Sequence, residues 1–182
     1  MAFSDLFADN LLLKWLRGDR ARHDLAVAMV GLKLGERFLL IGCGDGGLLA
    51  GLGGKVGYTG RACGTDTEAA AVARAERVAE RAGVLVEVQQ APPERLPYDD
   101  QSFDVVVVQR VGATAAARVF DLALGEAWRL VRPGGRCVVI RASGHGSTED
   151  LDVLGSRGFR GAHVLADRGG QLFIEAVRAR TD

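Results

Sequence analysis

The residues of this chain that could do chemistry begin with three glycines, Gly42, Gly44 and Gly46, placed where the apolar run FLLI ends. Glycine adopts positive φ angles and lets a ligand approach the backbone closely. If a helix begins behind such a loop, its free N–H groups can hold a phosphate or a carboxylate. Asp66 lies twenty residues past Gly46, a spacing at which a carboxylate can accept both hydroxyls of a ribose. The glycines and the acid together predict a nucleotide-type cofactor site.

The same residues allow two other interpretations. The glycines from Gly42 to Gly47 could form only a tight turn, with Asp66 as the N-cap of a helix that starts at TEAAA. The loop also fits the G-x-G-x-x-G pattern of NAD-binding domains through Gly42, Gly44 and Gly47. Three features count against NAD: residues 1–35 have a helical pattern, no separate substrate domain follows, and the chain ends in a hairpin pattern.

Hydrophobic spacing places these residues on regular elements. Ser4 is a candidate N-cap for a helix whose apolar face runs from Leu6 to Leu16. The run TEAAAVARAERVAERAG is rich in alanine, arginine and glutamate and ends in glycine, which favours a helix. In RPGG, a proline and paired glycines predict a turn. The sequence predicts helices over about 4–16, 20–32, 67–83, 115–131 and 148–157, a short helix after the glycine loop, strands over about 36–41, 61–66, 84–90, 103–109 and 136–142, and a two-stranded hairpin within 160–180.

The order of these elements predicts the fold class. Strands that alternate with helices form a parallel sheet with helices on both faces. The four consecutive valines of FDVVVVQ indicate a strand buried on both faces, at the centre of such a sheet. The terminal hairpin makes the last strand, Leu172 to Val177, antiparallel. We therefore expect one α/β domain over residues 1–182, with N-terminal helices in 1–35 and a doubly wound, Rossmann-like sheet of seven strands in 36–182.

Composition narrows the range of partners. The chain has 23 basic and 23 acidic residues and no long run of one sign, which argues against binding to nucleic acid or to an anionic membrane. No segment reaches the ~18 apolar residues of a membrane span, and acids stand where a secretory signal would carry lysine or arginine. Cys43, Cys63 and Cys137 lack metal-ligand spacing. We expect a cytoplasmic protein with no metal site.

Four stretches resemble class I S-adenosylmethionine-dependent methyltransferases, in particular the small single-domain enzymes that methylate metabolites. LKLGERFLLIGCGDG resembles the family's first motif and GTDTE its ribose acid, whereas ERLPYDDQSFDVVVV and EAWRLVRPGGRCVVI resemble the segments that lead into the fourth and fifth strands. The resemblance covers about Leu32 to Arg178. It implies S-adenosylmethionine as the methyl donor, with the glycine loop at its methionine end and Asp66 at its ribose. The cofactor-binding residues that it implies are Gly42, Cys43, Gly44, Gly46, Asp66, Thr67 and Gln109.

Three positions depart from the family pattern. Leu40 stands where the family usually has an aspartate or glutamate that supports the glycine loop. Aligned on ERLPY, Pro92 replaces the usual acid for the adenine amino group, and Pro93 replaces the residue whose N–H meets an adenine ring nitrogen. Proline has neither a side-chain acceptor nor an N–H. The amide of Gln90 could replace the missing adenine contact if the loop is displaced.

The resemblance leaves the acceptor open. Methyl transfer from a sulfonium is an in-line displacement on an activated donor, so a catalytic base is obligatory only if the acceptor must lose a proton. QRVGATAA lacks the N/D-P-P-Y pattern of relatives that methylate base amino groups, and we expect a small-molecule acceptor. His145 could act as a base, but it has a simpler role in a surface loop. Trp15 could help to cover the cofactor, but like His23 and His163 it is more simply a packing or surface residue, and no catalytic residue is assigned.

A second hypothesis follows from the departures at Leu40, Pro92 and Pro93. The chain could be a non-catalytic, methyltransferase-like protein that has lost cofactor binding and serves as an interaction or structural subunit. Titration with S-adenosylmethionine separates the two hypotheses, because only the first requires binding.

Overall fold

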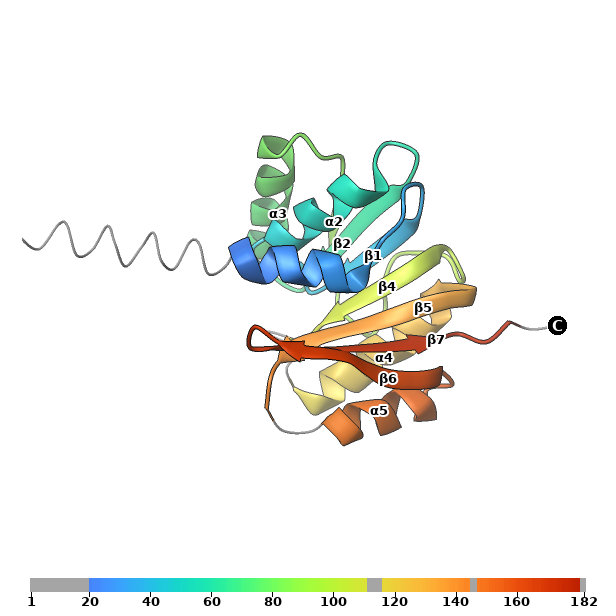
Figure 1. Cartoon of the computed structure of the whole chain (residues 1–182). Coiled ribbons are helices and arrows are strands. Elements are labelled where there is room, and N and C mark those ends of the chain that lie inside the picture. Colours follow the sequence, from blue (N-terminus) through green and yellow to red (C-terminus); the bar gives the residue numbers. More distant parts are fainter. Residues whose placement is uncertain (1–19, 111–115, 145–146, 181–182) are drawn as a thin grey trace, which may run out of the picture.

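Seven strands form one sheet, shown in Figure 1. The computed structural model describes residues 20–110, 116–144 and 147–180, so the helix expected over 4–16, with Trp15, and the loop histidine His145 lie outside it. The strand order is β3-β2-β1-β4-β5-β7-β6. The strands are β1 (Arg37–Ile41), β2 (Arg61–Asp66), β3 (Glu87–Gln90), β4 (Phe103–Gln109), β5 (Val131–Ala142), β6 (Arg160–Arg168) and β7 (Gln171–Val177).

The direction of the strands confirms the predicted fold class. β1 pairs in parallel with β2 and β4, and the pairs β2–β3 and β4–β5 are also parallel. β7 is antiparallel to both β5 and β6, as the terminal hairpin predicted. The sheet is therefore mostly parallel, with the antiparallel strand where the sequence placed it.

Helices cover both faces of this sheet (Figure 1). A helix over residues 20–30, α2 (Gly47–Val56) and α3 (Ala69–Arg81) lie on one face. On the other face lie α4 (Ala117–Leu130) and α5 (Ser147–Ser156). Each face of the sheet has its own buried apolar cluster. None of the described helices is long and apolar enough to cross a membrane.

The four valines of β4 form the centre of the molecule. Val105 to Val108 are all fully buried between β1 and β5. Their side chains alternate between the two faces, since Val105 and Val107 belong to the cluster under α2, whereas Val106 and Val108 belong to the cluster under α4. A strand with helices on both faces has no polar face, which explains the unbroken apolar run.

Two strands differ from their expected lengths. β5 begins at Val131, immediately after α4, because Val131 pairs with Phe103 before RPGG bulges out of the ladder. The bulge is held by the C-terminal segment: Gly134 N donates to Arg178 O at 2.8 Å. β3 begins only at Glu87, because the preceding residues close α3, where Val84 N donates to Ala79 O at 3.0 Å.

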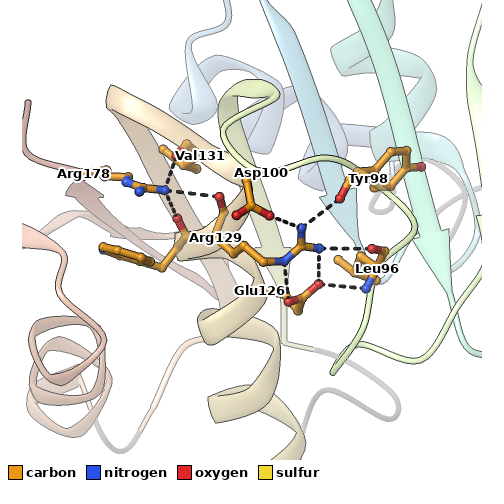
Figure 2. Close-up of polar contacts among 8 residues, drawn as sticks. Leu96, Tyr98, Asp100, Glu126, Arg129, Val131 and Arg178 are labelled. Carbon is orange, nitrogen blue, oxygen red and sulfur yellow. Dashed lines mark hydrogen bonds and ion pairs between the residues drawn. The ribbon is translucent and has the colours of Figure 1, made fainter.

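Arg178 closes the C-terminal end of α4 (Figure 2). Its Nη1 lies 2.6 Å from the carbonyl oxygen of Trp128 and 2.9 Å from that of Val131. The guanidinium also lies 4.0 Å from the centroid of the Trp128 ring. The last carbonyl groups of a helix lack partners within the helix, and a cation there complements the helix dipole. The segment after β7 is thereby fixed to α4.

Candidate functional site

Three neighbouring parallel strands, β2, β1 and β4, have their carboxyl ends at one edge of the sheet. In register, Ile41 of β1 lies opposite Thr65 of β2 and Val108 of β4. The residues that come next on these strands are Gly42, Asp66 and Gln109. The strand order reverses between β1 and β4, and in such sheets ligands bind outside the carboxyl ends of the strands at that point. The structure thus brings the predicted cofactor residues of three separate segments together.

The backbone of β2 holds the glycine loop in place. Gly42 N and Cys43 N both donate to the carbonyl oxygen of Thr65, at 2.8 and 3.1 Å. Gly44 N donates to Asp66 Oδ2 at 2.9 Å, and Gly46 N donates to the Cys43 carbonyl oxygen at 2.9 Å. The N–H groups of these loop residues therefore have acceptors without any acid at position 40. Sequence reasoning missed Thr65, since its contribution is a backbone carbonyl that any residue carries.

Leu40 is part of the core. It is 0% exposed and belongs to the same buried cluster as Val27 of the helix over 20–30, Leu48 of α2 and Val107 of β4. At the position where the family pattern has a carboxylate that supports the loop, this chain has a leucine that packs in the core. The departure at Leu40 therefore does not leave the loop without support.

Asp66 links the glycine loop to the start of α3. Besides Gly44 N, its carboxylate accepts from Glu68 N at 3.1 Å, and the Cys43 thiol lies 3.9 Å from Oδ2. The N-cap residue of α3 is Glu68, so Asp66 precedes the cap and is not the N-cap that the alternative interpretation required. A carboxylate offers about four lone-pair sites. The part-exposed Asp66 therefore retains acceptor capacity for ligand hydroxyls.

The glycines of the loop serve different purposes. Gly44 has φ +53°, and a Cβ built there meets nothing within 4 Å, so the loop faces open space at this residue. Gly46 has φ +84°, and a Cβ there would lie 2.4 Å from the Cα of Ala75 in α3. Gly44 thus borders the space that a ligand would take, whereas Gly46 is needed for the close approach of α3 to the loop.

The segment after β3 carries the other two departures. Pro92 is exposed and Pro93 is buried, and neither brings a polar side chain or an N–H to the edge. Gln90 lies in register with Asp66 and donates its Nε2 to the carbonyl oxygen of Thr67 at 3.0 Å. This hydrogen bond directs the Gln90 carboxamide, with its oxygen acceptor, to the neighbourhood of Asp66.

Arg129 of α4 fixes the next part of that segment (Figure 2). Its guanidinium donates to the carbonyl oxygens of Leu96 and Tyr98, at 3.1 and 2.9 Å, and to the carboxylates of Asp100 and Glu126, at 2.7 Å each. Glu126 in turn accepts from Leu96 N at 2.8 Å. Burial raises the pKa of Glu126, but hydrogen bonds from Arg129 and Leu96 N–H outweigh it and lower the pKa below its usual value.

We expect Arg129→Met to lower the free energy of unfolding by about 2–4 kcal/mol, because it removes the side-chain donor from the Tyr98 carbonyl and one of two donors from the Leu96 carbonyl, and leaves the half-buried Glu126 carboxylate without its cation. Urea unfolding followed by circular dichroism measures the change. Arg95→Met is the matched control: Arg95 is exposed in the same segment, and its replacement should cost less than about 0.5 kcal/mol. Equal losses in the two variants would contradict the anchoring role of Arg129.

The described residues at the edge include no evident general base. Burial, together with the nearby charge of Asp66, raises the pKa of the Cys43 thiol to about 12, so this cysteine stays protonated at neutral pH. His23 lies 3.4 Å from Asp45, and His163 contacts Gly161 O on β6, away from the loop. Within the described ranges, no three metal-ligating side chains are grouped so that they could hold an ion.

Comparisons with known proteins identify similar sequences. The model of the methyltransferase-domain family matches residues 39–139, more than half of the chain. The ubiquinone/menaquinone biosynthesis C-methyltransferase of Chromobacterium violaceum is 32% identical over 113 residues, which are 62% of this chain and 46% of that protein. A probable cobalt-precorrin-6B C(15)-methyltransferase (decarboxylating) of Saccharolobus solfataricus is 30% identical over 118 residues, 63% of this chain and 57% of that protein. The chain spans about half the length of these curated relatives.

A solved structure supports the fold independently. The crystal structure of a SAM-dependent methyltransferase from Aquifex aeolicus has a TM-score of 0.75 at 20% identity, and the match covers 86% of this chain and 89% of that one. At this identity the likeness concerns the fold.

Proposed function

This chain belongs to the family of S-adenosylmethionine-dependent methyltransferases, and on that basis we propose that it methylates a small-molecule acceptor. When bound, S-adenosylmethionine supplies an activated methyl group: a lone pair of the acceptor forms the new bond to the methyl carbon while the carbon–sulfur bond breaks and its electrons stay on sulfur. The protein's task is to hold the two reactants aligned, and such orientation can contribute about 7–11 kcal/mol. The absence of an evident base among the described residues is compatible with this task.

The observation that carries the proposal is the pairing of open space at Gly44 with spare acceptor capacity on Asp66 at one edge of the sheet. We assign the ribose hydroxyls to Asp66, with Thr67 beside it. The methionine end is assigned to the loop of Gly42, Cys43, Gly44 and Gly46, and Gln109 faces the cofactor from β4. The Gln90 carboxamide oxygen is the acceptor that we assign to the adenine amino group in place of a side chain at Pro92.

A small molecule is favoured as acceptor by the charge of the chain. Equal numbers of basic and acidic residues provide no overall attraction for a polyanion such as nucleic acid. The segment QRVGATAA, which begins with the last residue of β4, also lacks the pattern of base-methylating relatives.

Calorimetric titration of the protein with S-adenosylmethionine and S-adenosylhomocysteine tests the proposal. We expect both to bind, and Asp66→Asn to weaken binding by about 1.5–3 kcal/mol, roughly ten- to a hundredfold, because one charged acceptor for the ribose is lost. Asp45→Asn is the matched control, since Asp45 stands in the same loop but is turned toward His23 and Gly47 N. Its affinity should stay within about twofold of the parent.

Two results would count against the proposal. If neither compound binds to the folded parent protein, the non-catalytic hypothesis replaces it. If Asp66→Asn and Asp45→Asn bind equally well, the cofactor does not use Asp66, and the assignment of the ribose is wrong.

A further inference from the structure

A buried ion cluster lies at the carboxyl ends of β4 and β5, outside the residues assigned to the cofactor. It consists of Arg110, which follows β4, Arg141 near the end of β5, and Asp150 in the first turn of α5. Arg110 Nη1 donates to Asp150 Oδ1 at 2.7 Å, and Arg141 Nε donates to Asp150 Oδ2 at 2.5 Å. The side chains of Arg141 and Asp150 are 9% and 1% exposed.

The cluster carries more positive than negative charge. Two guanidinium groups share one carboxylate. Arg110 also lies 4.5 Å from the centroid of the Phe120 ring, which stabilises a cation. Arg141 donates its Nη1 to Ala142 O, but its Nη2 is buried and has no hydrogen-bond partner among the described residues. A buried cationic group without an acceptor is costly unless another anion supplies one.

Fixing α5 to the sheet does not require this excess. One arginine paired with Asp150 would bridge the same elements with balanced charge. Arg157, which follows α5, forms such a balanced pair with Asp121 of α4, one cation for one carboxylate. The second arginine therefore calls for a reason other than the attachment of α5.

The cluster lies next to the cofactor edge. Arg110 follows Gln109 directly, and its N–H donates to the carbonyl oxygen of Ile140 at 2.8 Å, which keeps it beside β5. β4 also borders β1, whose carboxyl end begins the glycine loop. An acceptor over β4 and β5 would thus lie beside a cofactor over β2, β1 and β4.

We infer that Arg141, with Arg110, forms an anion-binding site that takes a carboxylate or phosphate group of the methyl acceptor. The role in the acceptor rests on the proposed methyltransferase function, whereas the anion site itself does not. An oxygen of the anion accepts from Arg141 Nη2, and the charge of the cluster becomes balanced. The acceptor class is therefore an anionic small molecule.

Side-chain NMR of the full chain, without cofactor, tests the anion site. The Nε–Hε resonances of Arg110 and Arg141 are followed while sodium phosphate or sodium acetate replaces sodium chloride at constant ionic strength. We expect a saturable shift with at least one of the two probes, and the stronger response tells phosphate from carboxylate. Arg141→Met should weaken the response at least fivefold, with Arg110 as reporter, whereas Arg157→Met should leave it unchanged.

Asp150→Asn is expected to strengthen anion binding, the opposite of the effect of Arg141→Met. It removes the only negative charge of the cluster, so the probes should bind at least threefold more tightly than in the parent. Unchanged binding in Arg141→Met, or no saturable shift in the parent, would overturn the inference. Titration with S-adenosylhomocysteine distinguishes failure of the anion site from failure of the proposed function. Arg141→Met should bind S-adenosylhomocysteine with an affinity within twofold of that of the parent. If the parent itself does not bind S-adenosylhomocysteine, the proposed function fails, and the anion site has no role in binding a methyl acceptor.

Discussion

Replacing Gly44 by valine is expected to weaken the binding of S-adenosylmethionine more than a hundredfold, a loss of about 3 kcal/mol or more. A Cβ at this position enters space that no other atom occupies within 4 Å, at the point where the loop faces the edge of the sheet. The branched side chain would take the place of the ligand, and a bulky residue also resists the φ of +53°. Calorimetric titration of parent and variant measures the loss.

The control for this prediction has to carry the same backbone strain elsewhere. Gly83 has φ +67°, and a Cβ there also meets nothing within 4 Å, but it follows the end of α3 that lies away from Asp66. Gly83→Val should lose roughly 1–2 kcal/mol of stability from the left-handed conformation and keep its affinity. If Gly44→Val binds as tightly as Gly83→Val, the cofactor does not lie against the glycine loop.

The second large effect is expected at Leu40. Leu40→Asp should lower the free energy of unfolding by about 4 kcal/mol or more, since it removes a buried leucine and introduces a buried charge without a partner. The loop N–H groups that such an acid would need are already bonded: those of Gly42 and Cys43 to Thr65 O, and that of Gly44 to Asp66. Restoring the family's acid would therefore not restore its contacts.

Urea unfolding of Leu40→Asp and Leu40→Met separates these causes. Leu40→Met keeps the volume and the apolar character, so it should cost less than about 1.5 kcal/mol. A loss as small in Leu40→Asp as in Leu40→Met would contradict this account, and would mean that the glycine loop rearranges to donate to the new carboxylate.

Much of the fold could be predicted because its signals are local. The valines of β4 indicated a strand buried on both faces, and the alternation of helices and strands predicted a parallel sheet. The terminal hairpin pattern predicted the antiparallel β7. The errors were at element ends, where a contact from elsewhere decides the boundary. β5 starts early because Val131 pairs with Phe103, and β3 starts late because Val84 closes α3.

By itself the sequence determined the residue types in and around the site: the glycines of the loop, Asp66, and apolar residues at positions 40, 92 and 93. It could not determine their partners. The Thr65 carbonyl holds the loop, but every residue type has such a carbonyl, so the sequence does not single it out. A Cβ on Gly46 would lie 2.4 Å from Ala75, and this distance depends on how α3 packs against the loop. Arg110, Asp150 and Arg141 come from three separate segments, so only the packing of these segments shows that two arginines share one carboxylate. Spacing along the chain encodes helices, strands and turns, whereas hydrogen bonds between distant segments depend on strand register and helix packing, which only the tertiary structure sets.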